Sequence, residues 1–177
     1  GSKHHTVLAP VFWRWGDDAV GETNTVVGNV FLHETKLRTD LGVVPLYFRG
    51  RSATDAYDIS PPLFWSFRAQ GTHTLYLPPL LTRFQSRPRG WSLTQFPLLW
   101  AGQEEDRTHV FVPPVLWFWS DRDSTNVIAG NVFVHDGKDL NDFGVVPLYF
   151  GGRGDDGSAY DVSPLLFWDF RDSRKHS

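Results

Sequence analysis

The chain has 177 residues, of which 41% are hydrophobic, 15% aromatic and 21% charged, and its formal net charge is −3. This composition is typical of a folded domain rather than a disordered segment, and the length is sufficient for one hydrophobic core. The sequence shows no basic stripe, which argues against nucleic acid as a partner. It also shows no apolar run long enough to cross a bilayer as a helix.

Cysteine and methionine are both absent. A disulfide framework, a thiolate metal site and a cysteine nucleophile are therefore excluded. Gly1 and Ser2 resemble a cloning remnant, and the lack of methionine even at the start indicates a fragment or a processed chain. We expect one repeat domain over residues 3–174. The sequence does not determine the cellular compartment of the protein, and a secreted or cell-surface location is favoured.

Runs of β-branched and aromatic residues alternate with polar turns along the whole chain. In order, the runs are HHTVLAPVFWRW, TVVGNVFLHE, LGVVPLYFRG, YDISPPLFWSFR, THTLYLPPLLTRFQ, SLTQFPLLWAG, THVFVPPVLWFWS, NVIAGNVFVHD, FGVVPLYFGG and YDVSPLLFWDFR. The segments between them are polar and most are rich in Gly or Asp, as hairpin loops are. No apolar stripe with a helical period competes with this pattern.

A proline or a Gly-Asn pair marks the middle of each run, and this pivot recurs about every 17 residues, which indicates a repeat architecture. The pivots are Pro10, Asn29, Pro45, Pro62, Pro79, Pro97, Pro114, Asn131, Pro147 and Pro164. Proline has no N–H to offer a sheet and fixes φ, so it suits a bend between strands. We therefore predict an all-β chain of about ten tandem hairpins.

The two ends of the chain favour a closed arrangement of these hairpins. The segment 5–10 reads as the returning half of a hairpin and the segment 165–171 as an outgoing half, so together they would complete a shallow barrel or ring without free edges. Apolar residues directly after each pivot predict that the pivots gather at the centre. The alternative is an open antiparallel β-solenoid that continues into neighbouring repeats of a longer chain.

A longer duplication lies on top of the hairpin repeat. The segment AYDISPPLFWSFR matches AYDVSPLLFWDFR, and LGVVPLYF matches FGVVPLYF. Tyr57 and Tyr160 are equivalent, at an offset of about 103 residues or six hairpins. The sequence therefore predicts two related copies of the same structural block.

The PPLFW-type units resemble tandem hairpin repeats of uncharacterised bacterial proteins that carry VLPPLFW-like motifs. The resemblance covers nearly the whole chain but depends on a short apolar motif. It implies an all-β repeat fold, of the flower-shaped hairpin-barrel kind proposed for such proteins. It implies no activity and no catalytic residues.

Chemistry-bearing patterns are sparse. His33 and His135 occupy equivalent positions, but no HxH or HExxH spacing accompanies them. Residues 121–126 and 155–157 carry oxygen ligands suited to calcium but lack the terminal bidentate glutamate. There is no GxSxG nucleophile motif and no Gly-rich phosphate loop. We expect no metal site, no cofactor and no enzymatic activity.

Aromatic side chains are the strongest functional signal. Five tryptophans stand three or four residues after a pivot and are expected in the core: Trp13, Trp65, Trp100, Trp117 and Trp168. Trp15 and Trp119 lie nearer the loops, and Trp91 is expected in a loop with Arg87 and Arg89. Exposed indoles beside polar groups stack on sugar rings or anchor protein partners. These five residues are the candidate ligand-binding set.

The leading functional hypothesis is a non-enzymatic β-repeat module that serves as a binding or structural surface. Its sharper form is carbohydrate binding through loop-end aromatics, with a protein partner as the other ligand class. One alternative is a barrel that holds a lipid or another apolar ligand in its centre. The other is a hydrolase whose site is built from loops, which would need a pocket with converging acids.

Overall fold

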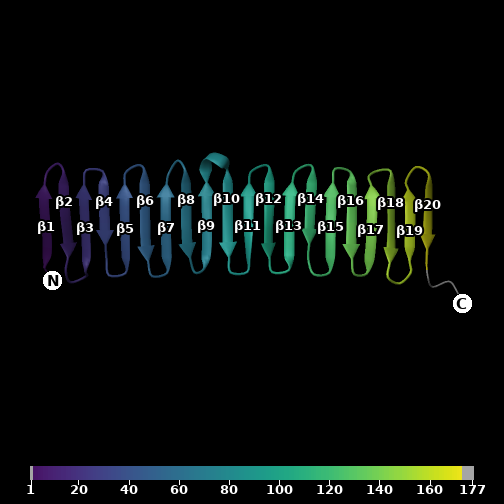
Figure 1. Ribbon diagram of the computed structural model, residues 1–177, viewed down its shortest axis with the longest axis horizontal. Coiled ribbons are helices and arrows are strands. Elements are labelled where there is room, and N and C mark those ends of the chain that lie inside the picture. Colours follow the sequence, from purple (N-terminus) through teal and green to yellow (C-terminus); the bar gives the residue numbers. More distant parts are fainter. Residues whose placement is uncertain (1, 173–177) are drawn as a thin grey trace. The chain divides into compact units, whose positions relative to one another are not determined.

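The computed structural model describes residues 2–172, which contain β-strands and one short 3₁₀ turn (Figure 1). The chain forms two compact units, Gly1–Pro88 and Arg89–Ser177. Residues 173 and 174, the end of the predicted domain range, lie outside the described residues. The described part of the chain contains no helix long and apolar enough to cross a membrane.

The first unit contains ten strands, and each pairs antiparallel with the next. They are β1 (Lys3–Leu8), β2 (Phe12–Asp17), β3 (Glu22–Val27), β4 (Val30–Glu34), β5 (Arg38–Val43), β6 (Tyr47–Ser52), β7 (Asp55–Ser60), β8 (Phe64–Ala69), β9 (Thr72–Leu77) and β10 (Thr82–Arg87), with the 3₁₀ turn η1 (Pro78–Leu80) before β10.

The second unit repeats this pattern with ten further strands, again paired antiparallel in sequence order. They are β11 (Gly90–Gln95), β12 (Leu99–Glu104), β13 (Arg107–Val112), β14 (Leu116–Ser120), β15 (Ser124–Ala129), β16 (Val132–Gly137), β17 (Leu140–Val145), β18 (Tyr149–Gly154), β19 (Ala159–Ser163) and β20 (Phe167–Arg171).

Every predicted pivot lies in the short turn between two strands, so the prediction of tandem hairpins is confirmed. The Gly-Asn pivots also tie neighbouring turns together. The Asn29 side-chain Nδ2 donates a hydrogen bond to the Val44 carbonyl at 3.2 Å, and Asn131 Nδ2 does the same to the Val146 carbonyl at 3.4 Å. An asparagine therefore replaces proline where its amide reaches the turn of the next pivot.

The predicted closed barrel or ring is wrong. In each unit the strand pairing runs from one strand to the next and does not return: β1 pairs with β2, and β20 with β19. An open antiparallel array, the alternative reading, agrees with this pairing. The repeat period and the hairpin direction are identical in open and closed arrays, so the sequence pattern could not separate them.

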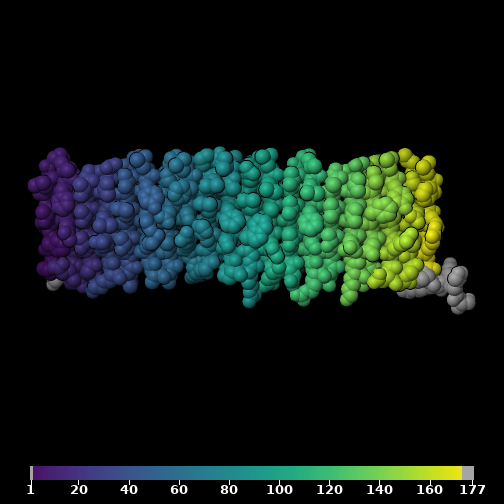
Figure 2. Space-filling view, viewed as in Figure 1, coloured from purple at the N-terminus to yellow at the C-terminus, as the bar shows by residue number. Residues whose placement is uncertain are grey.

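Each unit is a single layer, and this overturns the prediction that pivots gather at a buried centre. Side chains beside the pivots, such as Leu8 near Pro10 and Leu165 next to Pro164, are 70% and 84% exposed. Figure 2 shows side chains of successive strands of each unit at the surface. Among the described residues, Ala101 is the one hydrophobic residue that counts as buried. Stability must therefore come from cross-strand side-chain pairs and the hydrogen-bonded backbone rather than from an enclosed core.

Glycines let aromatic rings meet across a strand in this single layer. Phe31 and Phe48 flank Gly42 in register, and their ring centroids are 6.1 Å apart. A Cβ at Gly42 would lie 2.0 Å from Phe31 Cε1, so no larger residue fits without movement. Phe133 and Phe150 meet over Gly144 at 5.9 Å in the second unit.

Candidate ligand-binding face

The register places most of the large rings of each unit on one face, because directly paired residues of antiparallel strands point to the same side. We call this the aromatic face. In the first unit it carries Trp13, Trp15, Phe31, Phe48, Tyr57, Trp65, Phe67 and Tyr76. In the second unit it carries Trp100, Phe111, Trp117, Trp119, Phe133, Phe150, Tyr160, Trp168 and Phe170.

A row of polar and aromatic residues crosses the aromatic face of each unit, one residue per strand. We call it the polar row. In the first unit it is Trp15, Asn24, His33, Asp40, Gly50, Tyr57 and Phe67. In the second unit the same residue types recur in the same order as Trp119, Asn126, His135, Asp142, Gly152, Tyr160 and Phe170.

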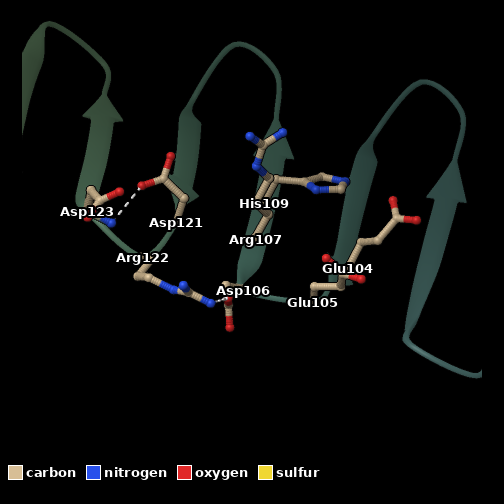
Figure 3. Close-up of a pocket in the computed structure, with 8 residues that line it drawn as sticks. All are labelled: Glu104, Glu105, Asp106, Arg107, His109, Asp121, Arg122 and Asp123. Atoms are coloured by element: carbon tan, nitrogen blue, oxygen red, sulfur yellow. Dashed lines mark hydrogen bonds and ion pairs between the residues drawn. The ribbon is translucent and has the colours of Figure 1, made fainter.

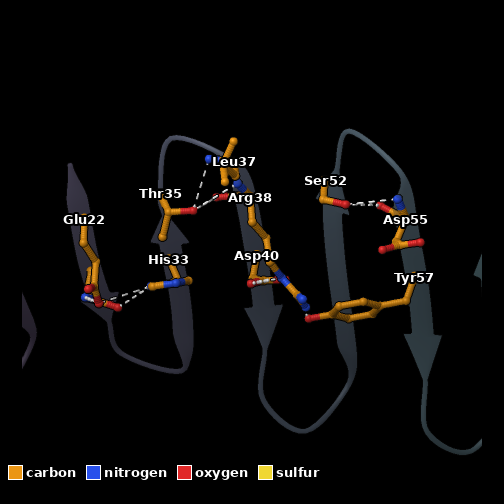
Figure 4. Close-up of polar contacts among 10 residues, drawn as sticks. Glu22, His33, Thr35, Leu37, Arg38, Asp40, Ser52, Asp55 and Tyr57 are labelled. Atoms are coloured by element: carbon orange, nitrogen blue, oxygen red, sulfur yellow. Dashed lines mark hydrogen bonds and ion pairs between the residues drawn. The ribbon is translucent and has the colours of Figure 1, made fainter. Parts of the chain in front are cut away.

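Hydrogen bonds hold the polar row of the first unit in place (Figure 4). His33 Nδ1 lies 2.7 Å from Asn24 Oδ1. The Tyr57 hydroxyl donates to Asp40 Oδ1 at 3.0 Å, and Arg38 Nε donates to the Asp40 carboxylate at 2.7 and 2.9 Å. Asp40 is 9% exposed, and its buried carboxylate is satisfied by these hydrogen bonds from Tyr57 and Arg38.

The second unit has the same hydrogen bonds within its polar row but a different residue beside the aspartate. His135 Nδ1 lies 2.6 Å from Asn126 Oδ1, and the Tyr160 hydroxyl donates to Asp142 Oδ1 at 2.8 Å. At the position of Arg38, however, the second unit has Leu140. The polar frame is therefore common to both units, whereas the charge beside the aspartate differs.

The glycine in each polar row makes the tyrosine–aspartate contact possible. A Cβ at Gly50 would lie 2.2 Å from both Asp40 Oδ1 and Tyr57 Cε1. A Cβ at Gly152 would lie 2.0 Å from Asp142 Oδ1 and 2.4 Å from Tyr160 Cε1. The space above each glycine is thus filled by the hydrogen-bonded pair from the two neighbouring strands.

These contacts shift the titration of the row. Burial by itself raises the pKa of Asp40, but hydrogen bonds from Arg38 and Tyr57 outweigh it and hold the pKa below its usual value. Burial and the hydrogen bond to Asp142 raise the pKa of Tyr160 to about 12. Asp40 is therefore ionised and Tyr160 neutral around neutral pH.

The raised pKa of Tyr160 predicts a loss of stability in alkali. Its folded-state pKa lies above the unfolded value, so the stabilising contribution is complete below about pH 10 and is lost as the pH rises toward 12. Tyr160→Phe should flatten this alkaline decline, as measured by urea unfolding between pH 8 and 11.5. An unchanged slope in the variant would contradict the assignment.

The candidate tryptophans separate into two groups. Trp15 and Trp119 are 45% and 37% exposed and occupy equivalent ends of the two polar rows. Trp91 is 40% exposed, but it lies in strand β11 rather than in a loop, and its register places it on the face opposite the aromatic face. The prediction of a loop position for Trp91 is therefore wrong.

The two candidate arginines make local contacts and lie outside the polar rows. Arg87 is the last residue of β10 and donates from Nη2 to Gln85 Oε1 at 3.0 Å. Arg89 lies in a turn and pairs with Glu105, with 3.0 Å between Nη1 and Oε1. Both members of the latter pair are well exposed, so it adds little stability.

The predicted core tryptophans are more open than expected. Trp65, Trp117 and Trp168 are exposed, although each follows a pivot by three or four residues. The prediction assumed a closed array with the pivots at its centre, and each unit is an open single layer instead. The aromatic face therefore presents more ring surface to ligands than the sequence indicated.

A cleft in the second unit is lined by loop acids near the β12–β13 and β14–β15 turns (Figure 3). Arg122 forms an ion pair with Asp106. Asp121 Oδ1 accepts hydrogen bonds from the backbone N–H groups of Asp123 at 3.0 Å and Ser124 at 2.9 Å. These backbone bonds lower the pKa of Asp121, so this acid shapes a turn.

Metal-binding geometry is not found among residues 2–172, where no three His, Cys, Asp or Glu side chains are arranged to hold an ion.

Comparison with known proteins identifies the fold. No protein-family model matches the sequence, and no curated protein matches it. The TCP10 domain of CPAP from Danio rerio, solved in complex with a peptide of Danio rerio STIL, is similar over 97% of this chain and 100% of that chain. Its TM-score is 0.52 and its sequence identity is 8%, so the likeness concerns the all-β fold alone.

A second solved structure, of the CPAP G-box domain, covers 97% of this chain and 99% of that chain at 11% identity. Its TM-score is 0.33, which is too low to indicate a shared fold.

Proposed function

We propose that the chain is a non-enzymatic binding module that takes a segment of a partner protein on its aromatic face. The observation that carries the proposal is the polar row, which occurs in both units with the same residue types in the same order. Packing alone does not require it, because rings such as Trp15 and Trp119 at its ends have no covering layer. Exposed indoles are the residues that anchor protein partners.

The chemistry of the row suits recognition better than catalysis. Its aspartates, tyrosines and asparagine–histidine pairs are hydrogen-bonded to one another, which fixes their rotamers and leaves further lone pairs for a ligand. The loop acids near Figure 3's cleft are tied into turns and ion pairs. The CPAP domain of similar fold was solved with a bound peptide, which agrees with a peptide ligand without specifying one.

Carbohydrate is the second candidate ligand, and one observation favours it. Trp15 is paired in register with Asn24, and Trp119 with Asn126. An indole beside an amide offers both a stacking surface and hydrogen bonds for a sugar ring. The apolar-ligand alternative depended on the interior of a barrel, which the open units do not form. The resemblance to bacterial VLPPLFW-type repeats bears on the repeat architecture and adds no ligand.

Selection from a displayed peptide library, run in parallel with a glycan array, tests the proposal. We expect enriched peptides that bind the purified chain and that compete with one another for the aromatic face. Glycan binding without peptide enrichment would replace the protein partner by a sugar. The absence of both would contradict a binding role for this face.

A further inference from the structure

On the face opposite the aromatic face, the two units differ at a position that changes the local charge. In the first unit Arg49 of β6 is paired in register with Leu41 and Asp58. In the second unit the equivalent position is Gly151 of β18, paired with Phe143 and Asp161. The second copy therefore retains the carboxylate and lacks the guanidinium.

In the first unit, an arginine occupies this position and contacts the carboxylate of Asp58. Arg49 Nε lies 3.5 Å from Asp58 Oδ1, and the same carboxylate oxygen accepts a hydrogen bond from the Tyr47 hydroxyl at 2.5 Å. A tyrosine and an aspartate from adjacent strands thus form a seat for a guanidinium. Arg49 occupies it as part of the chain itself.

The second unit keeps the seat and leaves it open. The Tyr149 hydroxyl donates to Asp161 Oδ1, as its counterpart does in the first unit. Without a side chain at Gly151 the surface is hollowed to about 540 Å³, and the hollow is lined by Val134, Phe143, Tyr149, Gly151, Arg153 and Asp161. The rings of Phe143 and Tyr149 lie 5.3 Å apart and form an aromatic wall.

Charge at this position also favours a cation. Asp161 is paired in register with Asp169, where the first unit has Ser66. Relative to the first unit, this row has therefore lost an arginine and gained an aspartate. Arg171 contacts Asp169 at 2.8 Å, and its charge also acts on Asp161, but no arginine is paired in register with Asp161 as Arg49 is with Asp58.

We propose that the hollow over Gly151 binds the guanidinium group of an arginine side chain from a partner protein, in the place that Arg49 fills in the first unit. A guanidinium is planar, donates to a carboxylate with fixed geometry and stacks on aromatic rings, so it matches this wall and seat better than an ammonium. Arg153 also lines the hollow, and its charge acts on Tyr149 as that of Arg49 acts on Tyr47, so an incoming guanidinium would share the hollow with Arg153, as Arg49 shares its strand face with Arg51 in the first unit. The residues that would contact the guanidinium lie on the face opposite the polar row, although His135, Asp142 and Gly152 of that row also border the hollow, and the inference does not rest on the proposed function.

Titration with acetyl-arginine-amide, followed by backbone amide NMR shifts of the whole chain, tests this inference. We expect saturable shifts at Gly151 and Asp161, and no such shifts with acetyl-citrulline-amide, which has the same shape without the charge. Asp161→Asn should weaken the binding at least fivefold. Trp15→Ala and Trp119→Ala on the aromatic face should leave it unchanged.

Comparison of the two units suggests one variant that should abolish arginine binding and one that should create a second site. Gly151→Arg should fill the hollow and abolish the shifts, whereas Arg49→Gly should open a second site and add shifts at Asp58. The Arg49→Gly variant keeps the inference testable if Gly151→Arg disturbs folding. Equal shifts with the citrulline compound, or no saturable shift at Gly151 in the unmodified chain, would overturn it.

Discussion

Replacing Gly50 by alanine should lower the free energy of unfolding by about 1–3 kcal/mol, the usual cost of overpacking. The added Cβ would lie 2.2 Å from Asp40 Oδ1 and from Tyr57 Cε1, so the hydrogen-bonded pair above the glycine must move. Backbone propensity alone predicts the opposite sign, because glycine inside a strand is less favourable than alanine by roughly 0.5–1 kcal/mol. The sign of the change therefore decides between packing and propensity.

Urea unfolding of Gly50→Ala, Gly152→Ala and Gly154→Ala measures this difference. Gly154 is the control because its Cβ would meet Ser158 Oγ at 2.6 Å and Asp156 Oδ1 at 2.8 Å, which are the ends of short side chains in a turn. We expect a large loss in the first two variants and a smaller one in the third, where only short side chains of an exposed turn must shift. A gain in all three would show that the polar rows are loosely packed.

Removing the indoles at the ends of the polar rows should have the largest effect on ligand binding. Truncation of an interface tryptophan typically costs about 2 kcal/mol or more, which is at least about 30-fold in affinity. Because Trp15 and Trp119 are equivalent, each single alanine variant should remove one binding event per chain. Trp15→Ala/Trp119→Ala should remove both, as measured by calorimetry with a selected peptide or glycan.

Trp91→Ala is the matched control for these variants. Its indole is 40% exposed, which is comparable with 45% for Trp15 and 37% for Trp119, but it lies on the opposite face of the second unit. Loss of a similar amount of exposed ring should therefore leave affinity and stoichiometry unchanged. Binding that depends on Trp91 and survives the double variant would place the site on the other face.

The hairpin architecture could be predicted from the sequence because it depends on local signals. Pivots such as Pro45 and Asn131 mark turns through their own backbone chemistry, and they do so whatever surrounds them. Closure could not be predicted in the same way. Closure requires the first and last strands to pair with each other, and no local sequence pattern indicates whether they do.

The polar row could be predicted only in part. The duplication already placed His33 and His135 in equivalent positions, and Asp40 and Asp142 have the same offset. Their meeting with Tyr57 and Tyr160 depends on the register of three strands and on a glycine between them. Comparing the two copies for recurring polar types at strand positions would have raised this set above the loop residues.

Exposure of the tryptophans was predicted correctly for Trp15 and Trp119 and incorrectly for Trp65, Trp117 and Trp168. Distance from the pivot was used as a measure of depth, which holds for a closed array with a centre. In a single layer no second layer covers any position along a strand, so exposure depends on neighbouring side chains.

Solvent access to the tryptophan indoles tests the central claim, that each unit presents an uncovered aromatic face. Indole N–H signals of the chain would be recorded with increasing amounts of a neutral paramagnetic gadolinium chelate. The account predicts strong broadening for Trp65, Trp117 and Trp168 as well as for Trp15 and Trp119. Protection of the three tryptophans that follow pivots, with broadening confined to Trp15, Trp91 and Trp119, would indicate a covered core and contradict it.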